Sequence, residues 1–445
     1  MVSDFFYPNA GGVESHLYHL SQRLIQRGHK VVIITHAYGN RTGVRTLTNG
    51  LKVYHVPMVV VFQQATVPTL YGFFPIFRSI VIREQISIVH GHQAFSSMCH
   101  EAIIHARTMG LKTCFTDHSL FGFSDPASIV MNKFLKFTLS DIDHVICVSH
   151  TSKENTVLRA ALTPQNVSAI PNAVIASRFK PDPSMQDPNV ITIVVVSRQT
   201  YRKGMDLLVA VVPPICREHP KVRFVIGGDG PKRIDLEQMR EKHLLHDRVE
   251  LLGSVKAHEV RKTLVRGQIF LNTSLTEAFC IGIVEAACAG LLVVSTKVGG
   301  VPEVLPKHMI LFAQPEEEDL VLALGRAIEM IRRKEVQPAK FNDELKDMYS
   351  WVNVAERTEK VYDAISQTRH PPLIERLRSY YGCGVIVGKL FCMFIALDYL
   401  LWIYLEWILP RDQIELAPKF PHKKFKKMCQ RADKEDGPGT ETRMS

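Results

Sequence analysis

The chain has 445 residues, of which 46% are hydrophobic and 22% are charged. This composition is typical of globular proteins, and the length predicts two domains of ordinary size with an appendage. The formal net charge of +10 indicates acidic partners such as phosphates or anionic lipid, but no basic stripe is interleaved with aromatic residues, which argues against nucleic-acid binding.

The first half of the chain alternates between short apolar strands and helices. A short first strand leads into a glycine-containing loop at residues 8–12, and a helix is expected from Val13 to Arg27, where Gly28 ends it. Further strands are predicted at residues 30–35, 86–90, 112–116 and 144–148. Repeated β–α alternation predicts a parallel sheet that is covered by helices.

A second α/β series follows a segment rich in proline and polar residues. This segment, residues 179–188, is predicted to link two domains. Strands are then predicted at residues 190–196, 222–226, 249–252, 269–271 and 291–295. The predicted fold class is therefore α/β, with two doubly wound Rossmann-like domains that face a cleft, because ligands bind at the carboxyl ends of such strands. The predicted domains are residues 1–178 and 189–345, and a helix at 346–366 returns to the first.

Residues 385–409 are mostly apolar, and a helix of this length spans about 37 Å, enough to cross a bilayer. The position after the globular pattern and the flanking aromatic residues favour a transmembrane helix. An amphipathic or buried helix is the alternative, because the segment contains Lys389, Asp398 and Glu406. If the segment crosses the membrane, these charges are expected to pair with partner helices.

The orientation of this helix is predicted from conflicting signals. The basic tail at residues 410–445 favours a cytosolic C-terminus. However, residues 1–8 lack the basic and apolar regions of a signal peptide. The nine dispersed cysteines, without a CxxC pair, are also typical of a reduced compartment and predict no zinc site or disulfide framework. We therefore predict that the globular part is cytosolic.

Several polar residues are expected at the carboxyl ends of strands. Gly11 and Gly12 precede a helix N-terminus, which favours anions, although any tight turn uses such a pair. Arg198 and Lys203 follow the first strand of the second domain, where they would neutralise a diphosphate leaving group. Gly228 lies in a turn that either binds phosphate or packs the following helix.

His118 is the histidine that we expect to contact the sugar or the acceptor, because it closes a predicted strand. His90 and His92 have the same ambiguity between ligand contact and a structural role. Glu277 and Glu285 lie eight positions apart around an apolar segment, so they are not two acids on a solvated face. Such a pair can hold the hydroxyls of a nucleotide sugar. Cys280 between them is expected to be a small buried residue rather than a nucleophile.

Taken in order, these motifs resemble those of the GT-B retaining glycosyltransferases of family 4, over about residues 1–365. Within that family, the amino-acid sequences of five segments are similar to those of the PIG-A type, the catalytic subunits of phosphatidylinositol N-acetylglucosaminyltransferase. These segments begin at Ser3, Gly12, Phe115, Thr151 and Leu271. The single helix near the C-terminus fits the same type.

The resemblance implies transfer of N-acetylglucosamine from UDP-GlcNAc to phosphatidylinositol with retention, as the first step of glycosylphosphatidylinositol (GPI) anchor biosynthesis. It implies an acceptor-side N-terminal domain, a UDP-sugar C-terminal domain and a place on the cytosolic face of the endoplasmic reticulum membrane. It also implies partner subunits of the PIG-C, PIG-H, PIG-P, PIG-Q and PIG-Y types. No metal or other cofactor is expected.

Carried over by position, Arg198 and Lys203 would hold the diphosphate, Glu277 the sugar hydroxyls and Glu285 the ribose. Gly12 would lie near the β-phosphate, and His118 would contact the sugar or support charge at the reaction centre. Two alternatives remain open at this point. One is another family 4 lipid-directed transferase, with GDP-mannose as donor, and the other is a non-catalytic membrane scaffold that kept the fold.

Overall fold

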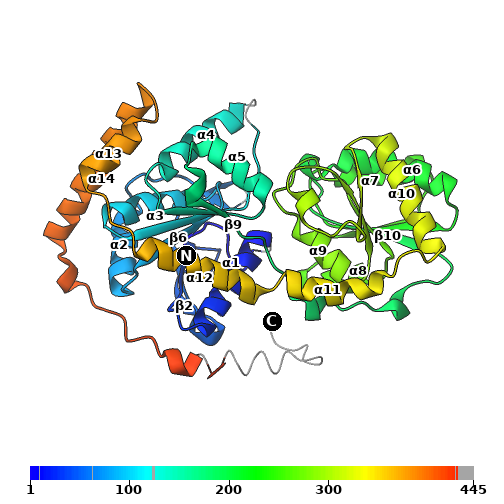
Figure 1. The fold of residues 1–445 in the computed structure, drawn as a ribbon, viewed down its shortest axis with the longest axis horizontal. Coiled ribbons are helices and arrows are strands. Elements are labelled where there is room, and N and C mark those ends of the chain that lie inside the picture. Colours follow the sequence, from blue (N-terminus) through cyan, green and yellow to red (C-terminus); the bar gives the residue numbers. More distant parts are fainter. Residues whose placement is uncertain (10, 63, 123–125, 426, 429–445) are drawn as a thin grey trace. The chain divides into compact units, whose positions relative to one another are not determined.

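The computed structural model describes residues 1–9, 11–62, 64–122, 126–425 and 427–428 (Figure 1). Ala10 of the predicted glycine loop lies outside them, as do Lys426 and residues 429–445 of the predicted basic tail. The chain forms two compact units, Met1–Pro171 with Trp351–Ser445, and Asn172–Ser350. Each unit is described below by itself.

The first unit is built mainly on parallel strands, and the apolar segments predicted β1, β6, β7 and β8 among them. Val2 forms bridges to both Ile34 and Gly91, so the short first strand joins a three-stranded sheet, of order β1-β3-β2, to a four-stranded sheet, of order β6-β7-β8-β9. The strands are β1 (Val32–His36), β2 (Gly43–Thr46), β3 (Lys52–Val56), β6 (Ile88–His92), β7 (Lys112–Asp117), β8 (His144–Cys147) and β9 (Val167–Ala169), with a separate hairpin of β4 (Val60–Phe62) and β5 (Ala65–Thr66).

Helices bury the apolar side chains of these strands. The helix α3 contributes to two core clusters, with Met98 in one and Ile103 in the other, and so ties the two sheets together. The helices of this unit are α1 (Gly12–Gln26), α2 (Phe74–Arg83), α3 (Ser97–Thr108), α4 (Pro126–Leu139), α5 (His150–Ala160), α12 (Trp351–Ser366), α13 (Leu373–Tyr381) and α14 (Val387–Ile408).

The second unit holds a six-stranded parallel sheet of order β12-β11-β10-β13-β14-β15. Its strands are β10 (Ile191–Val196), β11 (Val222–Gly227), β12 (Val249–Gly253), β13 (Ile269–Asn272), β14 (Leu292–Thr296) and β15 (Ile310–Ala313). Its helices are α6 (Met205–Glu218), α7 (Arg233–Lys242), α8 (Val260–Leu264), α9 (Ile281–Cys288), α10 (Glu317–Arg332) and α11 (Phe341–Met348). The predicted Rossmann-like α/β class is confirmed, and each strand predicted by range lies within two residues of its expected ends.

The segment predicted as a linker packs on the second unit. The side-chain amide of Asn342 donates to the carbonyl oxygens of Ala176 at 3.0 Å, Phe179 at 3.2 Å and Cys288 at 2.9 Å. The unit therefore begins at Asn172, before the proline-rich residues, whereas we expected a boundary after residue 178. The returning helix α12 belongs to the first unit, where it packs against α1.

Among the described residues, α14 is the one helix that is long and apolar enough to cross a membrane. Its two acidic side chains pair within the first unit. Asp398 is fully buried and its carboxylate lies 2.7 Å from His105 Nδ1, while Glu406 Oε1 lies 3.1 Å from Arg78 Nη2. We expected these side chains to pair with partner helices, but in the structure they pair with α3 and α2 of the same chain, because α14 packs along them.

Candidate functional site

The polar groups of the second unit gather at the carboxyl ends of β10 and β13. Lys203 ends the short 3-10 turn Tyr201–Lys203 that follows β10, and Glu277 lies in the loop between β13 and α9. Lys203 Nζ donates to Glu277 Oε1, and both side chains are largely buried. Burial alone lowers the pKa of Lys203, but the adjacent Glu277 carboxylate outweighs that effect and holds the pKa above its usual value. The pair therefore keeps a fixed positive charge beside an acceptor group.

Gly204 explains why the chain can bring Lys203 to this place. Its φ is +67°, and a Cβ atom there would lie only 1.7 Å from the carbonyl oxygen of Thr273. Thr273 Oγ1 in turn donates to the carbonyl oxygen of Lys203 at 2.9 Å. The turn after β10 is thus fastened to the end of β13, and only glycine fits the contact.

A buried hydrogen-bond network orients the Glu277 carboxylate. Ser274 Oγ lies 2.9 Å from Glu277 Oε1 and 2.8 Å from Asn272 Oδ1. The Asn272 amide donates to Ser295 Oγ at 2.9 Å, so the network reaches β14. The backbone amide of Gly300, in the Gly-Gly-Val-Pro-Glu segment, donates to the Glu277 carbonyl oxygen at 3.0 Å. These contacts hold the Glu277 side chain in one direction, as a group that binds a sugar requires.

Arg198 and Glu285 differ from this pair because neither side chain has an ion-pair or hydrogen-bond partner within the described parts of the chain. Arg198 is exposed. Its positive charge repels that of Lys203 and so offsets a small part of the increase in the pKa of Lys203. Glu285 lies on α9, half-buried, and burial raises the pKa of its carboxyl to about 7. An unpaired carboxyl in a partly buried position is suited to accept hydrogen bonds from ligand hydroxyls.

Close packing explains why residue 228 is a glycine in this structure. Its φ is +129°, and a Cβ atom would lie 1.8 Å from the carbonyl oxygen of Ser197. The turn after β11 therefore presses against the residues that carry Arg198. This contact differs from the packing on the following helix that the sequence left open, and contact with a donor phosphate remains a prediction.

The first unit contributes a glycine turn at the start of α1. Gly11 caps the helix, and a Cβ atom on it would lie 2.4 Å from Glu14 Oε2, so its small size serves packing. A Cβ atom on Gly12 would meet nothing within 4 Å. Space beside a helix N-terminus permits an anionic group to come close, which is what the prediction for Gly12 requires.

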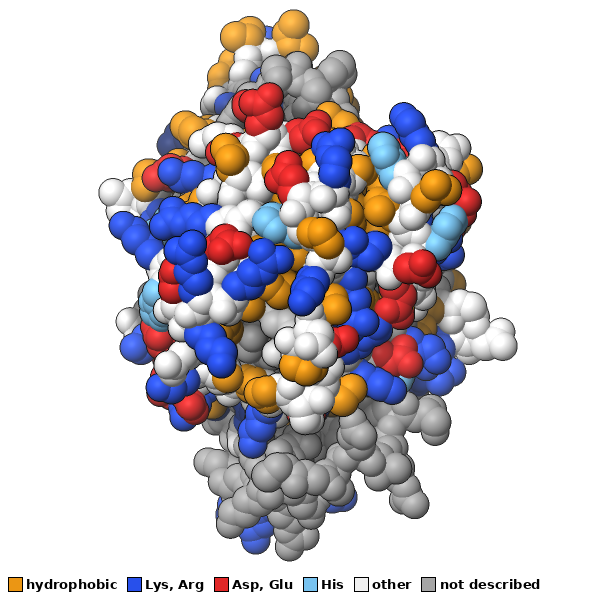
Figure 2. All heavy atoms as spheres, turned by 90° about the vertical axis from the view of Figure 1, so that its right-hand side faces the viewer, with side chains coloured by type: hydrophobic (Ala, Val, Ile, Leu, Met, Phe, Trp, Pro, Cys, Tyr) orange, Lys and Arg blue, Asp and Glu red, His pale blue; other side chains and the backbone are white. Residues whose placement is uncertain are grey.

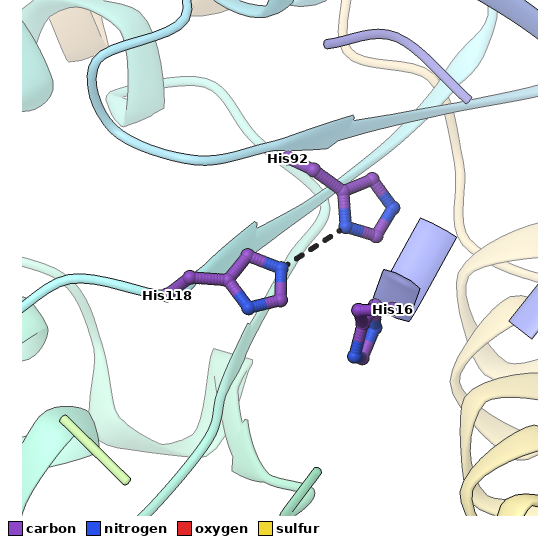
Figure 3. A group of neighbouring side chains, drawn as sticks. All are labelled: His16, His92 and His118. Carbon is purple, nitrogen blue, oxygen red and sulfur yellow. Dashed lines mark hydrogen bonds between the residues drawn. The ribbon is translucent and has the colours of Figure 1, made fainter. Parts of the chain in front are cut away.

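His118 follows the end of β7 and lies in a group of histidines (Figure 3). His92, at the end of β6, places Nδ1 3.4 Å from His118 Nε2, and His16 of α1 lies with its ring centroid 4.7 Å from that of His118. Burial lowers the pKa of His118 and His92 well below the usual value, and the neighbouring imidazoles add to the shift. These imidazoles are therefore neutral at pH 7.

Other residues position this group, and the sequence did not single them out. Asp117 is fully buried and accepts hydrogen bonds from the Ser119 amide at 2.9 Å, Thr156 Oγ1 at 3.0 Å and Arg159 Nη1 at 3.2 Å. These bonds fix the backbone on both sides of His118. His90, the other histidine of β6, uses both ring nitrogens, one with Tyr362 at 2.6 Å and one with Thr116 at 2.7 Å, so its role is structural.

Sequence reasoning also missed Ser274, Asn272 and His16 as members of these groups. Ser274 and Asn272 end or follow a strand that was predicted correctly, so their place at its carboxyl end was a usable signal. His16 gave no such signal, because its role depends on how α1 packs beside β6 and β7.

On the face of the molecule in Figure 2, positively and negatively charged side chains are mixed. Basic and acidic side chains are interspersed on it with apolar ones. This face therefore gives no support to binding along a nucleic-acid backbone, which needs a basic patch or stripe.

Solved structures with the same fold come from several glycosyltransferases. Sucrose-phosphate synthase from Thermosynechococcus elongatus matches with a TM-score of 0.68 at 19% identity, over 80% of this chain and 94% of that one. Anabaena HepE, solved in complex with UDP, matches with a TM-score of 0.64 at 16% identity, over 81% and 98%. These likenesses show that the chain has the GT-B fold.

Sequence comparison narrows this class. Residues 178–340 match the family "Glycosyl transferases group 1", and residues 36–125 match "PIGA (GPI anchor biosynthesis)". The chain is 62% identical to the phosphatidylinositol N-acetylglucosaminyltransferase gpi3 subunit of Schizosaccharomyces pombe, over 94% of this chain and 91% of that protein. A human protein named for the same enzyme is 54% identical, over 94% of this chain and 86% of that protein. The chain belongs to the PIGA family of phosphatidylinositol N-acetylglucosaminyltransferase subunits.

Proposed function

We propose that this chain is the catalytic subunit that transfers N-acetylglucosamine from UDP-GlcNAc to phosphatidylinositol, with retention, in the first step of GPI anchor biosynthesis. The names of the relatives support the sugar and the lipid. The structural observation that carries the proposal is the Lys203–Glu277 pair beside the exposed Arg198. A nucleotide sugar requires both kinds of group, cations for its diphosphate and a fixed carboxylate for its hydroxyls.

Arg198 and Lys203 bind the diphosphate and offset the charge that develops on the leaving UDP. They do so without a metal ion, since two cationic side chains supply the charge that a divalent cation would supply. Glu277 binds hydroxyls of the GlcNAc ring, and Glu285 binds the ribose. Gly11, Gly12 and Gly228 let the backbone approach the donor, with Gly12 near the β-phosphate, and His118 contacts the sugar.

The reaction is a displacement on one face of the sugar ring. The bond between the anomeric carbon and the UDP oxygen breaks, and a bond forms from an inositol hydroxyl oxygen to that carbon. The hydroxyl proton passes to the departing phosphate oxygen, so atoms and charge balance without a protein nucleophile. Cys280 is consistent with this course, because burial raises the pKa of its thiol far above neutral and keeps it protonated.

The protein acts at the cytosolic face of the endoplasmic reticulum membrane, in a complex with PIG-C-, PIG-H-, PIG-P-, PIG-Q- and PIG-Y-type subunits. Two observations support this part of the proposal. The relatives are named as subunits, and α14 exposes an apolar face that includes Leu400, Tyr404 and Trp407. Lipid or partner helices would cover such a face.

A donor test decides the substrate. Microsomes from cells that lack this protein, supplied with the full chain, are incubated with either tritiated UDP-GlcNAc or tritiated GDP-mannose, and the labelled phosphatidylinositol products are separated. We expect label from UDP-GlcNAc alone. Consumption of UDP-GlcNAc without a labelled lipid, or a labelled lipid from GDP-mannose alone, would contradict the proposal and favour another lipid-directed transferase.

A further inference from the structure

The histidines at the strand ends of the first unit have an arrangement that sugar binding does not require. His16, His92 and His118 each offer one ring nitrogen, and these three atoms all lie within 4.8 Å of one another. Figure 3 shows the rings converging from α1, the end of β6 and the residue after β7. Three imidazoles that converge in this way are typical of the protein ligands of a tetrahedral zinc ion with one open position.

The distances between the rings support this comparison. Two ligands of a tetrahedral zinc ion, each about 2.0–2.1 Å from the metal, lie roughly 3.3–3.4 Å apart. His92 Nδ1 and His118 Nε2 are separated by 3.4 Å. The two rings share a long hydrogen bond at this separation, which is also the separation of two ligands of one zinc ion. The His16 nitrogen lies within 4.8 Å of the other two, and it would complete the site by rotation about its χ2 torsion, which is soft for histidine.

The protonation of the group also suits a metal ion. His92 is completely buried and His118 half-buried, and burial lowers the pKa of both imidazoles well below the usual value. A neutral imidazole has a lone pair on one ring nitrogen, so after a tautomer shift of the hydrogen-bonded ring both facing nitrogens can bind a metal ion. His90 is excluded as a ligand because Tyr362 and Thr116 already occupy both of its ring nitrogens.

The backbone under two of the ligands is rigid. β6 pairs with β7 in parallel register, with His92 opposite Thr116. The buried Asp117 and Arg159 hold the chain on either side of His118. Ligands on fixed elements favour binding because little conformational entropy is lost when the ion enters.

We propose that His16, His92 and His118 form a site for one divalent transition-metal ion of the zinc class, whose fourth ligand is water. The ion is a competitor rather than a cofactor, because it occupies the ring nitrogen that His118 would offer to the sugar. Binding of the metal does not depend on the proposed function, and only the inhibition of transfer rests on it.

The binding test uses the full-length chain in detergent, freed of metal with a chelator and titrated with Co²⁺, whose tetrahedral complexes absorb strongly in visible light. We expect a saturable tetrahedral spectrum at one Co²⁺ per chain, displaced by Zn²⁺. His16→Gln should weaken binding by more than about 100-fold, since even outer-shell partners of metal ligands are worth about 10- to 100-fold. His246→Gln is the matched control, because His246 is exposed and pairs with Glu241.

A gain-of-signal variant separates ligation from loss of structure. His16→Cys should keep the cobalt bound and add a thiolate-to-cobalt charge-transfer band, which a misfolded protein would not produce. Absence of saturable binding to the wild type would overturn the proposal. The same visible spectrum in His16→Gln and the wild type, or no new band in His16→Cys, would also overturn it.

Inhibition is measured separately, in microsomes that hold the full complex. Zinc should inhibit transfer by the wild type, a chelator should restore it, and His16→Gln should need at least about tenfold more zinc. Equal zinc sensitivity in the two proteins would overturn the competitor role. If the wild type transfers no sugar at all, the proposed function fails, while the cobalt spectrum still decides the metal site.

Discussion

The two units carry polar groups of opposite character at the ends of their strands. In the second unit, Lys203 and Glu277 form an ion pair, and Arg198 adds an exposed charge. In the first unit, burial keeps His92 and His118 neutral. A charged group costs free energy to bury unless it is paired, whereas a neutral imidazole is buried at much lower cost. The comparison teaches that the two units bury polar groups in different ways, the second by pairing opposite charges and the first by keeping imidazoles neutral.

Removal of the fixed cation tests the charged site most severely. Lys203→Gln should lower the rate of GlcNAc transfer by about 100- to 1,000-fold, because a preorganised charge at the leaving group is lost. The rate is measured in microsomes with UDP-GlcNAc and phosphatidylinositol. Lys232→Gln is the control, since Lys232 forms comparable ion pairs with Asp206 and Asp235 in the same unit. Equal losses in both variants would show that the effect is not specific to the site.

Substitution of two glycines distinguishes a glycine that packing requires from one that leaves room for a ligand. Gly204→Ala should destabilise the protein by about 3 kcal/mol, because the new Cβ atom meets the Thr273 carbonyl and the φ angle is positive. Gly12→Ala should change the free energy of unfolding by less than about 0.5 kcal/mol, since no atom is near. Thermal unfolding measures both. If Gly12→Ala nevertheless weakens donor binding, the space beside Gly12 is used by the ligand.

The neutral site is probed at His118. His118→Gln should reduce transfer by about 10- to 100-fold, the worth of one or two hydrogen bonds to the sugar. His308→Gln is the control, because His308 is exposed and pairs with Glu344. Unchanged transfer by His118→Gln would mean that the histidine group serves another purpose.

Glu285 should give the smallest effect, in the pH dependence of stability. Burial raises the pKa of its carboxyl to about 7, so the folded state holds a proton that the unfolded state releases near pH ~4.3. This contribution to stability is present below pH ~4.3 and is lost as the pH rises through about 7. Glu285→Gln should therefore raise stability at pH 8 by roughly 1–2 kcal/mol and leave it unchanged at pH 4. An equal change at both pH values would contradict the shifted pKa.

The sequence predicted much of this comparison, for physical reasons. The buried parallel strands are runs of β-branched residues, so β10, β11 and β14 were found within a residue. Residues at their carboxyl ends could then be placed together, which located Lys203 and Glu277. β2 was missed because all four of its residues are exposed, so its sequence carries no apolar pattern. β15 was also missed, although it has the same length as β13.

Other features depend on packing that no local pattern encodes. The approach of His16 to His118 requires α1 to lie beside β7, and the pairing of Asp398 with His105 requires α14 to dock on α3. Likewise, the close approach of Gly228 to the Ser197 carbonyl oxygen depends on how the turns after β10 and β11 pack together. The sequence named His118, Asp398 and Gly228 as candidates, and the tertiary structure supplied their neighbours.

One measurement tests most directly the claim that the charged site of the second unit carries the reaction. Cells that lack this protein receive the wild type, Glu277→Gln or Glu250→Gln, and GPI-anchored proteins are counted at the cell surface. Glu250 is the matched control because it forms an exposed ion pair with Arg266 in the same unit. We predict that the wild type and Glu250→Gln restore the anchored proteins and that Glu277→Gln, expressed at the same level, does not. Full restoration by Glu277→Gln would contradict the account and favour a non-catalytic scaffold.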